Sequence, residues 1–102
     1  MSVDLIRTIR TPHSERYILR RAKSDVGALD IHYLPDRHVH GMLTVVDGGG
    51  IKDSEIPDLL THIDEVLLPD VSLDDRKLSF TVVVGRVHGA FEVDGGSEAE
   101  AP

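Results

Sequence analysis

The sequence predicts an α+β fold, with a mainly antiparallel β-sheet in the chain order β-β-β-α-β and one amphipathic helix packed on one face. Apolar and polar residues alternate over much of residues 17–45 and again over 77–84, which is the period of a strand. Between these regions, residues 54–67 repeat apolar side chains at spacings of three and four, which is the period of a helix.

Length and composition suggest three segments in the 102-residue chain: a flexible N-terminal arm (1–14), one α+β domain (15–94) and a disordered acidic tail (95–102). The arm has no sustained apolar period. The tail holds no apolar residue larger than alanine and cannot contribute to a core.

The first elements of the domain are three strands joined by two turns. Residues 17–23 predict a strand, and residues 24–27 a turn with Gly27 in the left-handed conformation. Residues 29–33 alternate and predict a second strand. Pro35 then fixes φ at the first central position of a turn over 34–37, and residues 39–45 predict the third strand.

The alternation also predicts the register of the second and third strands. If Leu34 pairs with His38, then Leu29 faces Leu43 and the apolar partners share one face, as a half-buried sheet requires. The opposite, polar face then receives four side chains: Asp30, His32, His38 and His40.

A glycine run at 48–50 ends the third strand, and Asp53 or Ser54 is expected to cap the helix that follows. Pro69 is expected to end the helix. The last β region spans residues 77–93, where the parity of the apolar residues switches at Gly85. We therefore expect a β-bulge or tight turn at Gly85, or a Gly85-Arg86 hairpin, either of which allows a fifth strand.

The charge is unevenly distributed: residues 1–23 carry about +4 and the remainder −11, for a net charge of −7. This acidic surface argues against a nucleic-acid partner, because phosphates would be repelled. The absence of cysteine excludes disulfides and thiolate metal sites. No apolar run is long enough to span a bilayer and no block of signal-peptide length opens the chain, so we expect no membrane partner and a cytoplasmic location.

One constellation could bind a metal ion. The spacing of His38-Val39-His40 on a strand places both imidazoles on one face, and the predicted register sets His32 opposite His40 with Asp30 nearby. The pair is similar to the ligand pair of cupin-type metalloproteins. The glutamate that would follow in a cupin is absent, so the chain is not assigned to that family. Two alternative interpretations are solvated cross-strand polar pairs and a patch of clustered imidazoles that responds to pH.

Other chemistry has less support. The strand, glycine loop and helix order at 48–54 resembles a phosphate cradle, but the P-loop order is absent and Asp47 and Asp53 would repel phosphate. No serine lies in a nucleophile-elbow motif. The sequence identifies no catalytic residue and no cofactor, and leaves open whether the protein is an enzyme.

We therefore predict a non-enzymatic binding or regulatory module that acts through a protein partner or self-association. Exposed edges, at residues 17–23 and in an overhanging C-terminal strand, would supply the contacts. The alternative is a metal- or small-ligand-binding protein, enzymes included, that uses the His cluster. A third class, an acidic mimic of nucleic acid, follows from the eight acids and no base between Asp53 and Asp75.

Overall fold

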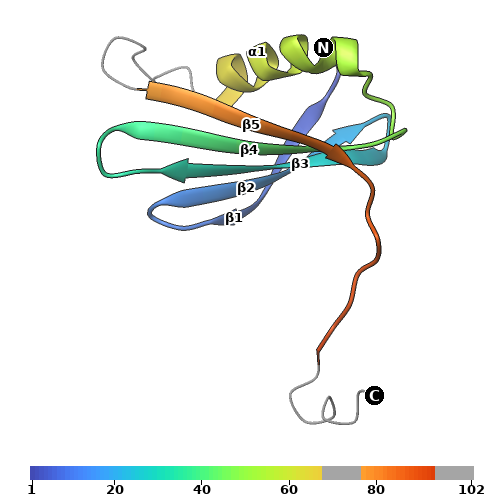
Figure 1. The fold of residues 1–102 in the computed structure, drawn as a ribbon, viewed down its shortest axis with the longest axis horizontal. Helices are drawn as coiled ribbons and strands as arrows, with labels where there is room; N and C mark the ends of the chain where they lie inside the picture. Colours follow the sequence, from blue (N-terminus) through green and yellow to red (C-terminus); the bar gives the residue numbers. More distant parts are fainter. Residues whose placement is uncertain (68–76, 94–102) are drawn as a thin grey trace.

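The computed structural model describes residues 1–67 and 77–93 and has an α+β fold (Figure 1). Its elements are β1 (Asp4–Arg10), β2 (Ser14–Arg21), β3 (Ser24–Tyr33), β4 (His38–Val46), a 3₁₀ turn (Asp53–Glu55), α1 (Ile56–Leu67) and β5 (Lys77–Gly85). The strands form one sheet in the order β1-β2-β3-β4-β5, antiparallel except for the parallel pair β4-β5. The predicted fold class is confirmed, and a fifth strand is present.

The register predicted for the central hairpin is confirmed. Leu29 pairs with Leu43, Ile31 with Gly41, and His32 with His40. The turn at 34–37 closes this hairpin, where the Leu34 N–H donates to the His38 carbonyl at 2.8 Å. Four hairpin side chains are almost completely buried on the face that α1 covers: Leu29, Ile31, Leu43 and Val45.

The predicted N-terminal arm needs correction, because residues 4–10 form strand β1, paired antiparallel with β2. The register shifts between Arg7 and Ile9. This bulge reverses the side-chain parity halfway along a seven-residue strand, so no continuous alternation is visible in the sequence. It follows that β2 is internal, and the prediction that residues 17–23 form an edge strand is wrong.

The turn between β2 and β3 also differs from the prediction. It lies at Ala22 and Lys23, whose φ angles are +51° and +70°, which is the backbone sign of a two-residue hairpin turn. Gly27 instead lies inside β3, where an added Cβ would be 2.4 Å from the Thr44 carbonyl oxygen. The glycine is needed for close backbone approach, which a sequence pattern does not distinguish from a turn.

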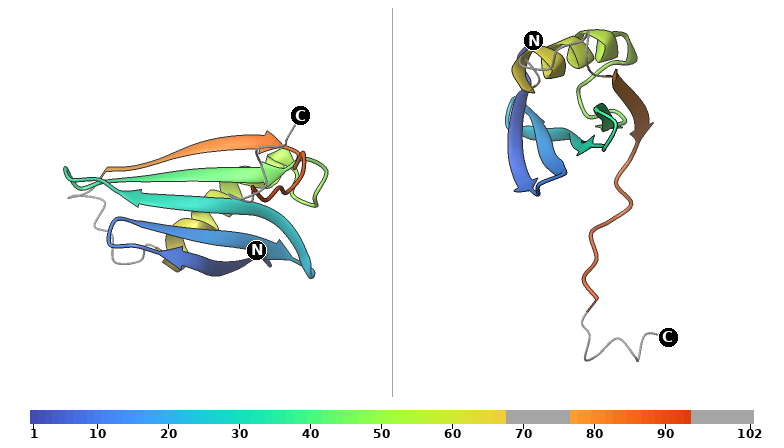
Figure 2. Two further views of the ribbon diagram at one scale, coloured as in Figure 1. Left: turned by 90° about the horizontal axis from the view of Figure 1, so that it is seen from below. Right: turned by 90° about the vertical axis from the view of Figure 1, so that its left-hand side faces the viewer.

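The helix covers one face of the sheet, and the core lies between the two layers (Figure 2). Leu59 and Ile63 are fully buried against the sheet. The expected cap residues, Asp53 and Ser54, lie in the 3₁₀ turn, and it is the Glu55 carboxylate that accepts the Lys52 N–H at 3.0 Å.

β5 ends at Gly85, and residues 86–93 form no strand, bulge or hairpin, contrary to the alternatives expected there. The segment runs away from the sheet on the side opposite α1 (Figures 1 and 2). The tail predicted over 95–102 lies outside the described residues.

We predict that Gly27→Ala lowers the free energy of unfolding by about 1–3 kcal/mol, because the new methyl group meets backbone that cannot move aside. Gly85→Ala is the matched control: nothing lies within 4 Å of its added Cβ, so a change within about 0.5 kcal/mol is expected. Urea unfolding followed by circular dichroism measures both, and equal losses would contradict the packing argument.

Candidate functional site

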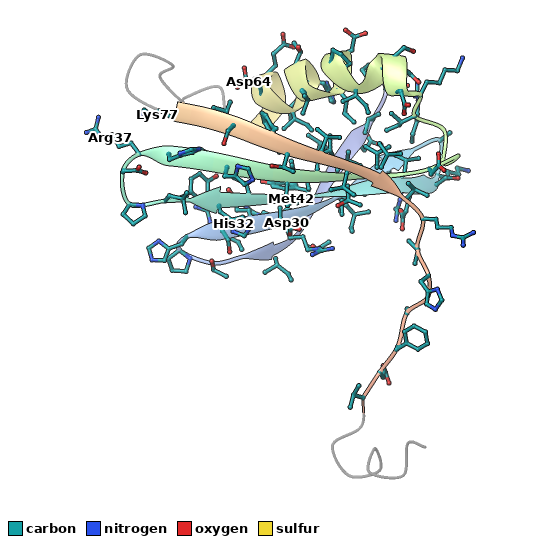
Figure 3. The ribbon with its side chains drawn as sticks, viewed as in Figure 1. Asp30, His32, Arg37, Met42, Asp64 and Lys77 are labelled. Carbon is teal, nitrogen blue, oxygen red and sulfur yellow. The ribbon has the colours of Figure 1, made fainter. Side chains whose placement is uncertain are left out.

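The predicted histidine cluster lies on the outer face of the sheet, which is the face opposite α1 (Figure 3). β4 and β5 bring two of its members together on one hydroxyl group. The Nε2 of His38 lies 2.8 Å from the Ser79 Oγ, and the Nδ1 of His40 lies 2.9 Å from the same atom. Ser79 arrives there because it pairs with His40 in the parallel ladder.

The other two predicted ligands have different surroundings. Asp30 forms an ion pair with Arg16 at 3.3 Å, and His32 is exposed opposite His40. Among the described residues, no three His, Asp or Glu side chains are close enough to hold one metal ion. In this arrangement His38 and His40 are the pair with converging nitrogens, and the four-residue metal site stays a prediction.

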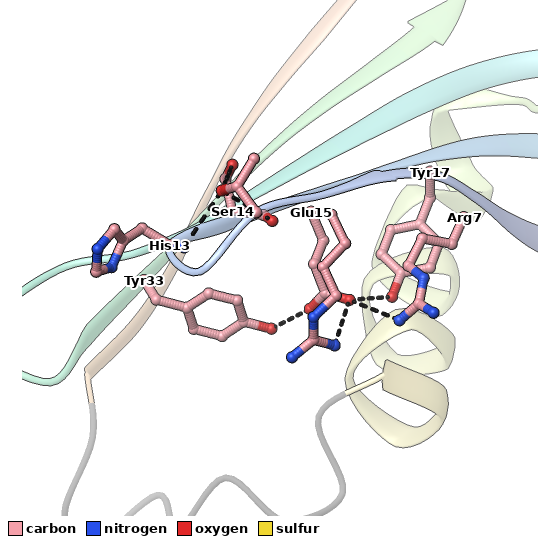
Figure 4. Close-up of polar contacts among 8 residues, drawn as sticks. Arg7, His13, Ser14, Glu15, Tyr17 and Tyr33 are labelled. Carbon is pink, nitrogen blue, oxygen red and sulfur yellow. Dashed lines mark hydrogen bonds and ion pairs between the residues drawn. The ribbon is translucent and has the colours of Figure 1, made fainter.

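A second polar cluster, which the sequence did not reveal, lies on the core face (Figure 4). Its centre is Glu15, which is only 7% exposed. The Tyr17 hydroxyl donates to Glu15 Oε1 at 2.9 Å, and the Tyr33 hydroxyl donates to Oε2. Arg7 and Arg10 of β1 each place a guanidinium nitrogen 3.4 Å from Oε1. We call these five residues the Glu15 cluster.

The hydrogen bonds of the Glu15 cluster set its protonation. Burial raises the pKa of Glu15, but the bonds from Tyr33 and Tyr17 and the charge of Arg10 outweigh it, so the net pKa is lowered. Burial and the bond to Glu15 raise the pKa of Tyr33 to about 12. The carboxylate is therefore ionised and both phenols are neutral near pH 7, so every contact is charge-assisted.

The Glu15 cluster holds β1, β2 and β3 together and does not expose a reactive group. The acceptor atoms of Glu15 are used by side chains of β1, β2 and β3, so the cluster ties the edge strand β1 to the sheet. One feature of the sequence points to this buried carboxylate: Glu15 lies two residues before Tyr17, so both side chains fall on the same face of the strand as the apolar Leu19. The pattern does not predict this role because residues 1–14 read as an arm and the predicted strand begins only at Tyr17, after Glu15.

The backbone of the glycine-rich loop, which resembled a phosphate cradle, forms hydrogen bonds with other parts of the chain. The Asp47 N–H donates to the Gly85 carbonyl, and Arg21 donates to the Gly50 carbonyl at 3.0 Å. Gly48 and Gly50 have φ of +73° and +110°, so these glycines serve the turn.

The two edges of the sheet differ in their protection. β1 carries Asp4, Arg7 and Arg10 and is interrupted by a bulge, and both features discourage pairing with another chain. β5 has nine residues, of which Lys77 at its start is the only charged one. Among the described residues no strand lies beyond β5, and its backbone edge is open.

The core is incomplete at the β5 edge. Leu78, Phe80 and Val82 point to the core side but are only half-buried, and Val84 is 43% exposed. From the helix, Leu60 and Leu67 are also half-buried against the same core. The apolar side chains of β5 therefore remain partly uncovered, and a further strand beside β5 would gain contacts with them.

No protein-family model matches this chain, and neither a curated protein nor a solved structure matches it. In the described residues, no helix has the length and apolar character needed to cross a lipid bilayer.

We predict that Glu15→Gln destabilises the protein at pH 7 by about 1–3 kcal/mol, because a neutral amide loses the charge-assisted bonds and leaves Arg7 and Arg10 unpaired. The folded-state pKa of Glu15 is lowered, so its contribution is present above the unfolded pKa and is lost as the pH falls through the folded value.

Wild type and Glu15→Gln should therefore differ at pH 7 and converge in acid, as measured by urea unfolding at a series of pH values. Glu65→Gln, on the exposed side of α1, is the control and should follow wild type. A gap between wild type and Glu15→Gln that does not change with pH would contradict the electrostatic role.

Proposed function

We propose that this protein is a non-enzymatic protein-binding module whose β5 edge accepts a strand from a partner chain. The single observation that carries the proposal is the combination of an uncharged, open edge from Leu78 to Gly85 with half-buried apolar residues beside it. Strand addition supplies backbone hydrogen bonds for affinity, and side-chain contacts on alternate residues for selectivity.

The contrast between the two edges supports this choice. An edge that is not used for binding is normally blunted by charge, proline or a bulge, as β1 is. The Glu15 cluster, with its acceptors occupied, and the outer-face histidines, which contact Ser79 and Thr81, offer no comparable unsatisfied surface. A cytoplasmic location is part of the proposal, since a chain without cysteine suits a reducing compartment.

Val84→Pro tests the edge. The Gly85 carbonyl faces β4, and backbone groups alternate sides along a strand, so the Val84 N–H faces the open edge. Proline there removes a donor for the partner and spares the β4-β5 ladder. Val84→Ala, which keeps the N–H, is the matched control.

The measurement is affinity capture of bound chains by the full-length protein, with a photoreactive label on Thr81→Cys to locate the contact. We expect labelled, captured protein with wild type and Val84→Ala, and its loss with Val84→Pro. Equal capture by all three, or contacts that never label from position 81, would overturn the proposal.

A second candidate function is binding of a metal ion or small ligand at the outer-face histidines. One observation favours it: the two ring nitrogens of His38 and His40 converge on the Ser79 hydroxyl within 2.9 Å, which is a starting geometry for two of the ligands of a zinc ion.

Zinc titration followed by NMR of the histidine ring protons tests this candidate. Binding predicts saturable shifts at His38 and His40, with smaller ones at His32, and none at His62, which lies on α1 and contacts the Val3 carbonyl. Shifts that grow linearly and equally at every histidine would exclude a site.

A further inference from the structure

Residues 86–93, which we call the protruding segment, have the sequence pattern of a strand but no partner in the described chain. Val87, Phe91 and Val93 lie on one parity, and they are 72%, 80% and 84% exposed. Arg86, His88 and Glu92 lie on the other parity. Alternation of this kind is typical of a half-buried strand, so the segment lacks the surface that would cover its apolar side.

The open β5 edge matches this segment in length and in side-chain pattern. Eight residues of the segment can lie antiparallel to the eight residues 78–85. When Phe91 is set opposite Phe80, Val93 falls opposite Leu78 and Val87 opposite Val84. All three pairs then lie on the core side, where β5 leaves apolar residues half-buried.

The polar side chains agree with the same register. Glu92 falls opposite Ser79 on the outer face, beside the two imidazoles that contact this hydroxyl and two residues from Lys77. The register thus brings the Glu92 carboxylate near the basic Lys77, which is the only charged residue of β5. A one-residue slip would place Phe91 on the outer face and Glu92 against the core.

We propose that the protruding segment of one chain adds antiparallel to β5 of a second copy, and reciprocally, so that the protein is a strand-exchanged homodimer. This inference rests on the proposed function, because it names the occupant of the strand-accepting edge. Exchange of an identical element between copies is a low-cost route to a dimer.

The conformation at Gly85 favours a second copy over a fold-back within one chain. The same register would be reached by a hairpin turning at Gly85 and Arg86, which requires positive φ at Gly85. Among the described residues, the glycines with positive φ are Gly48 and Gly50. The Gly85 carbonyl instead accepts the Asp47 N–H, and the segment leaves the sheet (Figure 1).

The chain has no cysteine, so designed disulfides report this pairing without background. The register sets Thr81 opposite Ala90 of the second copy, and both residues are exposed. Directly opposed residues lie within the Cα range of a disulfide. We expect a mixture of Thr81→Cys chains and Ala90→Cys chains to form a linked heterodimer on mild oxidation. A mixture of Val83→Cys and Ala90→Cys chains, offset by two residues, is the control and should link far less.

Light scattering on the full-length protein should give twice the mass of one chain. Phe91→Asp should give a monomer that keeps the helix and five-stranded sheet by circular dichroism, because Phe91 makes little contact in its own chain. Phe91→Leu should remain dimeric. Val66→Asp, at a 52% exposed apolar position on α1, controls for the added charge and should also remain dimeric.

The outcomes separate this inference from the proposed function. A monomeric wild type overturns the inference, and so does a Thr81→Cys/Ala90→Cys double variant that closes its disulfide within one chain. A dimer that Val84→Pro disrupts and Phe91→Asp does not also overturns the inference, but it leaves the strand-accepting edge intact. A dimer that neither Val84→Pro nor Phe91→Asp disrupts overturns the proposed strand exchange. If Val84→Pro also leaves affinity capture unchanged, the proposed strand-accepting function is overturned as well.

Discussion

The pairing of β3 with β4 is the constraint on which the rest of the structure depends. Side chains alternate along both strands, so one register decides which residues meet α1 and which form the outer face. The same register places Gly41 at the core face of β4, where an added Cβ would lie 2.5 Å from the ring of Phe80. Phe80 can therefore cover Gly41, and this contact seats β5 beside β4 in the parallel ladder.

How far the sequence predicted the fold depended on whether a pattern was continuous. The central hairpin was predictable because alternation and Pro35 agree on one register, and that register includes the pairing of His32 with His40. β1 was not, because its bulge breaks the alternation after Arg7. The turn before β3 was misplaced because Gly27 resembles a turn glycine, although close approach to Thr44 is what requires it.

The candidate sites followed the same rule. Two histidines on one strand could be placed together from spacing alone, whereas their contact with Ser79 depends on a parallel pairing across 39 or more residues, which the sequence did not fix. The Glu15 cluster draws on three strands, and two of their pairings were unknown or shifted. A buried carboxylate surrounded by tyrosine and arginine is visible only once the strands are aligned.

The difference between the two sheet edges decides what kind of assembly strand addition could build. Pairing between the β5 edges of two copies is isologous and closes a pair, so a longer assembly would need the β1 edges to pair as well. Reciprocal exchange would occupy the β5 edges of both copies at once, leaving one β1 edge at each end of the joined sheet. Arg7 and Arg10 are held there by Glu15, and the bulge twists the strand out of register, so neither end offers a flat, uncharged template. The ion pairs that hold β1 to the sheet would thereby limit the assembly to one closed pair.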